Sequence, residues 1–95
     1  MSDTDKDKEF YEMADAHISV ANKQASKTSN PGKVSATILY SAARFNTFLI
    51  ASNSDSADEL ASRKEEACKY LMAEYQKMLD EHFEDYTKNF SKYLK

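Results

Sequence analysis

Apolar and polar positions follow one another along the chain in a pattern that predicts three helices. Over residues 5–27 the apolar positions follow one another at steps of 3, 1, 3, 1, 3 and 4 residues, which places them on one side of an amphipathic helix. Asp3, Thr4 or Asp5 can cap its start, since short polar side chains accept hydrogen bonds from the first free N–H groups. The apolar side consists of Phe10, Met13, Ala14, His17, Ile18, Ala21 and Ala25.

A second helix is expected over residues 34–52, after a break at residues 29–32 that holds the only proline and the only glycine. Of the 18 residues from Val34 to Ala51, 12 are apolar and Arg44 alone is charged. A helix that is apolar on nearly every side must be covered on more than one side. The pattern therefore predicts a central helix buried among neighbours, and its interspersed polar residues argue against a membrane span.

The third predicted helix is the longest and runs over residues 56–94 without a proline or a glycine. Ser56 and Glu59 fit a capping box, in which each side chain accepts a hydrogen bond from the other residue's backbone N–H. Beyond Leu60 the apolar pattern repeats every eleven residues, or about 3.67 residues per turn, which is typical of a straight or slightly right-handed helix. The acidic run 80–85 is the one place where a bend is expected.

The predicted lengths suggest how the helices pack. At ~1.5 Å per residue the first two helices span about 35 Å and 28 Å, and the third up to about 58 Å. In an antiparallel three-helix bundle the third helix would extend far beyond the others, with an apolar surface that a soluble monomer rarely exposes. Either the chain folds back on itself or a second copy covers this surface, and we expect the second copy, in a dimer or a tetramer. The expected interface residues are Phe83, Tyr86, Phe90, Tyr93 and Leu94.

Composition agrees with a single all-α domain over residues 1–95, of which residues 1–4 are expected to be disordered. One cysteine and one glycine exclude a disulfide scaffold, a multi-cysteine zinc module and a glycine-rich phosphate loop. One cysteine and one glycine thus limit the class of protein, and the charges limit its partners.

The 13 Lys and Arg residues and 16 Asp and Glu residues give a net charge of −3. Segment 16–54 has no acid but only four bases, too few to predict a nucleic-acid partner. With no secretory leader in view, a cytoplasmic location is expected.

The sequence holds no pattern typical of a catalytic, metal or cofactor site. Di-iron bundles use Glu-x-x-His motifs, but the residues three before His17 and His82 are Ala14 and Leu79. Cys68 lies in the middle of the third helix, where a buried and unreactive thiol is expected. We therefore expect no enzymatic activity, no bound metal and no cofactor.

Arg44 is the main candidate for a site, because its guanidinium stays charged and rises from the most apolar helix. Such a group must reach water or a carboxylate. One interpretation is a buried ion pair with Asp15, Glu65 or Glu66 that fixes the register of the helices. The other is an interhelical cleft for a small molecule or an anion, lined by Arg44, Tyr40, Asn46, Asp15 and His17.

Several segments together resemble one known family. Its most specific part is Arg44-Phe45-Asn46. The family consists of short bacterial proteins known only as a domain of unknown function. The resemblance implies a bacterial, helical and cytoplasmic protein, and it implies no activity. The segments that carry it are 10–18, 33–36, 40–48 and 75–79, together with Tyr86.

These observations favour a small structural or interaction module that self-associates through the second and third predicted helices. A groove that receives a helix of another protein is a further mode of binding. The alternative is a regulatory protein that binds a small molecule or an anion near Arg44.

Overall fold

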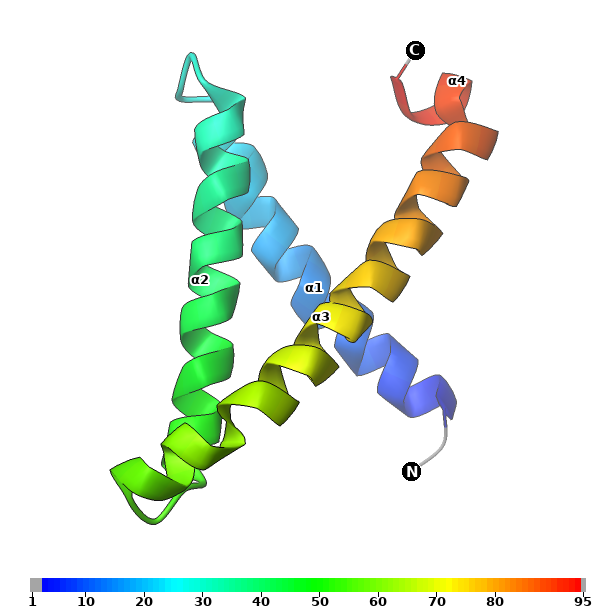
Figure 1. Cartoon of the computed structure of the whole chain (residues 1–95). Helices are drawn as coiled ribbons and strands as arrows, with labels where there is room; N and C mark the ends of the chain where they lie inside the picture. Colours follow the sequence, from blue (N-terminus) through cyan, green and yellow to red (C-terminus); the bar gives the residue numbers. More distant parts are fainter. Residues whose placement is uncertain (1–2, 95) are drawn as a thin grey trace. The chain divides into compact units, whose positions relative to one another are not determined.

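The computed structural model describes residues 3–94, with side chains from Asp7 onward. In this range α1 spans Asp3–Ala25, α2 Pro31–Ser52, α3 Ala57–Lys88 and α4 Phe90–Leu94, and no strand is present (Figure 1). The all-α fold class is confirmed over these residues, with four helices in place of three. The chain divides into two compact units, Met1–Leu49 and Ile50–Lys95, and each is described by itself.

The first unit contains α1 and most of α2, which are joined by a turn over residues 26–30. α1 ends at Ala25, two residues before its predicted end, with Lys23 in its last turn, where a cation interacts favourably with the helix dipole. α2 begins at Pro31, earlier than predicted, because proline has no N–H to leave unpaired and its fixed φ suits a first helical residue. The Asn30 carbonyl accepts a hydrogen bond from the Lys33 N–H at 3.0 Å.

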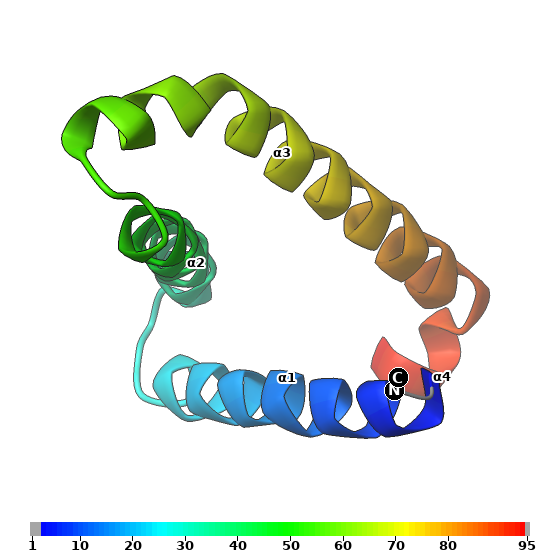
Figure 2. The same ribbon diagram turned by 90° about the horizontal axis from the view of Figure 1, so that it is seen from below.

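Within the first unit α2 is mostly exposed, whereas its composition predicts a helix covered by neighbours on more than one side. Its one buried residue is Val34, which is 9% exposed and lies near the turn. In both ribbon views α1 and α2 diverge from the turn (Figure 1, Figure 2), so this unit does not show the side-by-side antiparallel packing predicted for them. Because the helices are close only near the turn, the large apolar side chains further along α2 are exposed: Ile38, Leu39, Tyr40, Phe45, Phe48 and Leu49.

The second unit contains the last turn of α2, all of α3, and α4. Ser56 is the N-cap of α3, and its Oγ accepts a hydrogen bond from the Glu59 N–H at 3.1 Å, which confirms half of the capping box. The Glu59 carboxylate accepts from the N–H of Asp55 instead of the N–H of Ser56. The reciprocal bond is therefore made one residue earlier than predicted.

α3 is continuous through residues 80–85 and ends at Lys88, so the helix is interrupted after the acidic run and not within it. The predicted continuous helix to residue 94 is wrong, since Asn89 separates α3 from α4. The Asn89 backbone N–H donates to the Asp85 carbonyl at 2.9 Å, and its Nδ2 donates to the Asp85 carboxylate at 2.8 Å. An asparagine side chain that bonds locally in this way competes with continued helix.

α4 folds back against the end of α3. The rings of Tyr86 and Tyr93 stack with centroids 4.5 Å apart and planes inclined by 25°. The Tyr93 hydroxyl donates to the Asp85 carboxylate at 2.9 Å. Folding back thus brings two of the five predicted interface residues together, while Phe83, Phe90 and Leu94 remain exposed with no ring contact to them.

Candidate functional site

Arg44, the main candidate from the sequence, is exposed on α2. No ion pair or hydrogen bond joins its side chain to another described side chain. Of the two environments that a guanidinium tolerates, water and a carboxylate, the structure has the first. Within the first unit, α1 diverges from α2 and leaves this side of the helix uncovered, and the ion pair with Asp15, Glu65 or Glu66 stays a prediction.

The other residues predicted around Arg44 do not converge on it. Tyr40 lies one turn earlier and is exposed, whereas Asn46 is half-buried and lies two residues later, on the other side of α2. Asp15 and His17 belong to α1, and both are exposed. No hydrogen bond or ion pair links these five described side chains, so an anion site built from them stays a prediction.

Two further findings concern the chemistry of the described residues. Nowhere from residue 3 to residue 94 do three or more His, Cys, Asp or Glu side chains gather closely enough to hold a metal ion. The thiol of Cys68 is free and exposed, so the predicted burial of this residue is wrong. The reason is that α3 and α4 meet only near residues 85–93, which leaves the middle of α3 uncovered within its unit.

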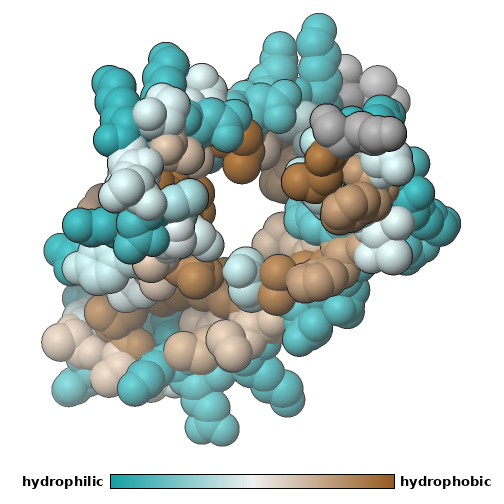
Figure 3. Space-filling view, turned by 90° about the horizontal axis from the view of Figure 1, so that it is seen from above, coloured by the Kyte–Doolittle hydropathy of each residue, from teal (hydrophilic) through white to brown (hydrophobic). Residues whose placement is uncertain are grey.

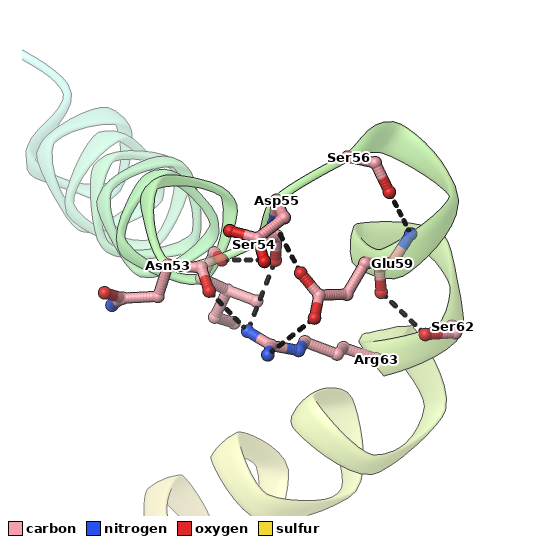
Figure 4. A network of polar contacts seen from close by, with 8 residues as sticks. Asn53, Ser54, Asp55, Ser56, Glu59, Ser62 and Arg63 are labelled. Atoms are coloured by element: carbon pink, nitrogen blue, oxygen red, sulfur yellow. Dashed lines mark hydrogen bonds and ion pairs between the residues drawn. The ribbon is translucent and has the colours of Figure 1, made fainter.

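A polar cluster that the sequence analysis missed joins the end of α2 to the start of α3 (Figure 4). Arg63 lies at its centre: Nη1 donates to the Asn53 carbonyl at 3.0 Å and to the Ser54 Oγ at 3.3 Å. Its Nη2 donates to the Glu59 carboxylate at 3.3 Å. In turn the Ser54 hydroxyl donates to the Ile50 carbonyl at 2.8 Å, so the cluster orients the connection between the helices.

The donors and acceptors of this polar cluster pair with one another. The cluster therefore stabilises the connection between α2 and α3 and offers no site for a ligand. Arg63 follows Glu59 by four residues, the favourable spacing for an acid and a base on one helix. That spacing is visible in the sequence and would have indicated the ion pair. The bonds to Asn53 and Ser54 depend on the path of the chain between the helices, and no local spacing predicts that path.

A further candidate surface is an apolar side of α3, here called the α3 stripe. At 3.6 residues per turn, its members fall on one side of the helix, while most of the acids and bases fall on the other. Brown apolar residues are visible on the face of the molecule drawn in Figure 3. The leucines of the stripe are half-buried and its other members are exposed. The α3 stripe consists of Leu60, Cys68, Leu71, Met72, Tyr75, Met78, Leu79 and Phe83.

The opposite side of α3 is polar and internally paired. Lys77 contacts Glu74 at 2.9 Å, and the hydrogen bond and charge of that carboxylate raise the pKa of the Lys77 ammonium. Gln76 Nε2 donates to the Asp80 carboxylate at 3.0 Å. Tyr70, five residues before Tyr75 in the stripe, lies among these polar groups. Such a division into a charged side and an apolar side is typical of a helix that packs against another helix.

The fold and this surface define a small all-helical protein with an amphipathic helix uncovered within its own unit. The chain belongs to the family described as Protein of unknown function (DUF3144), which matches residues 10–87. The predicted resemblance to a family of unknown function is thereby confirmed, and it extends over α2, most of α1 and nearly all of α3. No curated protein and no solved structure matches the chain.

The family's description assigns no activity, so the biochemical role is unknown. Across the described residues, each helix is too short or too polar to pass through a lipid bilayer.

Proposed function

We propose that this protein is a small interaction module that self-associates and that it acts without catalysing a reaction. The observation that supports the proposal is the α3 stripe. Phe83 is 71% exposed and belongs to a contiguous apolar surface, of a kind that soluble proteins rarely leave in water unless a partner covers it.

Other surfaces add to the same proposal. The exposed apolar side chains of α2 extend the area available to a second copy. Near the chain end, Phe90 and Leu94 are exposed, whereas Tyr86 and Tyr93 are partly engaged with each other. A helical bundle completed by a second copy would cover these residues together. The module would act in the bacterial cytoplasm, and the exposed free thiol of Cys68 fits such a reducing compartment.

The mass of the protein in solution tests this proposal. One chain has a mass of 10.8 kDa, so light scattering of the full chain at micromolar concentration should give at least twice that value. A mass equal to one chain at all concentrations would overturn the proposal, since the stripe would then be covered within a single copy.

A pair of aromatic variants locates the surface. Phe83→Asp places a charge in the α3 stripe and should shift the mass toward that of one chain. Tyr70→Asp is the matched control, because Tyr70 is similarly exposed, at 64% against 71% for Phe83, but lies on the polar side. The control should keep the mass of the unmodified protein, and far-UV circular dichroism should show that both variants remain helical.

A further inference from the structure

We infer that two copies pair antiparallel through the α3 stripe, centred near Met72 of each copy. The inference rests on the proposed self-association. It adds which helix face meets which, in what direction and in what register.

The distribution of charge along α3 determines the direction. Residues 60–72 carry three bases and two acids, a net charge of +1, whereas residues 73–85 carry one base and five acids, a net charge of −4. A parallel pair would place the two strongly negative halves against each other. An antiparallel pair places each negative half against a slightly positive one, and charge complementarity of this kind selects among the ways in which two surfaces can dock.

The position of α4 limits where the partner can lie. Because Tyr93 stacks on Tyr86, α4 occupies the end of this apolar side beyond Phe83. The open part of the stripe therefore runs from Leu60 to Phe83, and its middle lies close to Met72, near the boundary between the two charged halves. A pair of helices centred there covers the open stripe of both copies.

The exposed area approaches what a specific pair requires. Met72, Tyr75, Met78 and Phe83 are 72%, 44%, 43% and 71% exposed. At about 200 Å² for each large side chain, they offer about 460 Å² per copy and about 900 Å² for two. The half-buried leucines add to this area, which brings the total close to the lower limit of specific interfaces, about 1,200 Å².

Disulfide formation tests the direction. In the antiparallel pair the two Cys68 residues are about 14 Å apart along the axis, whereas two residues at position 72 are offset by about 1.5 Å. A disulfide requires Cα atoms within about 7 Å. On oxidation, the Met72→Cys variant in a Cys68→Ala background should form a cross-linked dimer, and the unmodified protein should not.

The outcomes separate this inference from the proposed function. If Cys68 and the Met72→Cys position cross-link equally well in a species of twice the chain mass, the pair is parallel. Self-association would then stand and the antiparallel inference would fall. If the protein is a monomer that does not cross-link, with α3 covered by the rest of its own chain, both are overturned.

Discussion

Arg44 and Arg63 both lie on helices, but the groups around their guanidinium groups differ. Arg63 lies beside a chain connection that presents a backbone carbonyl and a hydroxyl, and it has Glu59 one turn earlier, so three groups accept its N–H donors. Arg44 is in mid-helix, where the backbone carbonyls are already used by the helix itself. Within the described part of its own unit, no carboxylate forms an ion pair with Arg44, and its side chain is exposed.

A first prediction concerns Tyr93. Its hydroxyl donates a hydrogen bond to the Asp85 carboxylate, and this bond and the charge of Asp85 raise the pKa of Tyr93. Asp85→Asn should therefore lower the pKa of Tyr93 toward its ordinary value. The change can be followed by the ultraviolet absorbance of tyrosinate in an alkaline titration, and the Tyr93→Phe variant identifies which step belongs to Tyr93.

The sign of the pH dependence follows from the same bond. Because the protonated hydroxyl is the donor, the contribution of this bond to the free energy of unfolding is present below the ordinary tyrosine pKa of about 10. It is lost as the pH rises through the raised pKa of Tyr93. A Tyr93 pKa at or below the ordinary tyrosine value would contradict the prediction.

At the scale of single helices, the N-terminus of α3 depends on its cap. Ser56→Ala removes the acceptor of the Glu59 N–H, and the loss of an N-cap hydroxyl costs about 1 kcal/mol. Urea unfolding followed by circular dichroism should show this decrease. Ser62→Ala is the control, since the Ser62 hydroxyl bonds only to a carbonyl inside the helix. It should change the free energy of unfolding by less than about 0.5 kcal/mol.

The boundary between α3 and α4 gives a third prediction. Asn89→Ala removes the side-chain bonds to Asp85 and introduces the residue with the highest helix propensity. We expect α3 and α4 to merge into one helix, which separates the rings of Tyr86 and Tyr93. Carbon chemical shifts measured by NMR should become helical across residue 89. Thr87→Ala, two residues earlier and within α3, should leave the break in place.

For the whole molecule, the predicted self-association has a thermodynamic consequence. If folding and pairing are linked, mass action makes the melting temperature rise with protein concentration. Thermal unfolding recorded over a hundredfold range of concentration should show this rise for the unmodified chain and for Tyr70→Asp. Phe83→Asp should melt at a temperature that does not depend on concentration.

The helices and their caps were predictable because they depend on residues close in sequence. The apolar period predicted α1 and α3, and Ser56 with Glu59 predicted where α3 begins. The break at Asn89 was not predictable from local propensity. An asparagine inside a helix is only mildly unfavourable, and here the gain comes from a stack between Tyr86 and Tyr93, seven residues apart. The exposure of Arg44 could not be predicted from the sequence either, because the burial of a side chain depends on which helices cover it.

By itself the sequence determined the all-α class, the approximate helix boundaries and the amphipathic character of α3, because these properties follow from propensity, capping and periodicity within a few turns. The tertiary structure decided that α4 folds back at Asn89, that Arg63 joins the end of α2 to α3, and that α2 and the α3 stripe are exposed. These outcomes depend on contacts between segments that the periodicity of either segment does not specify. Burial in particular is a property of two surfaces together, so one apolar surface predicts that a partner is needed but not which one.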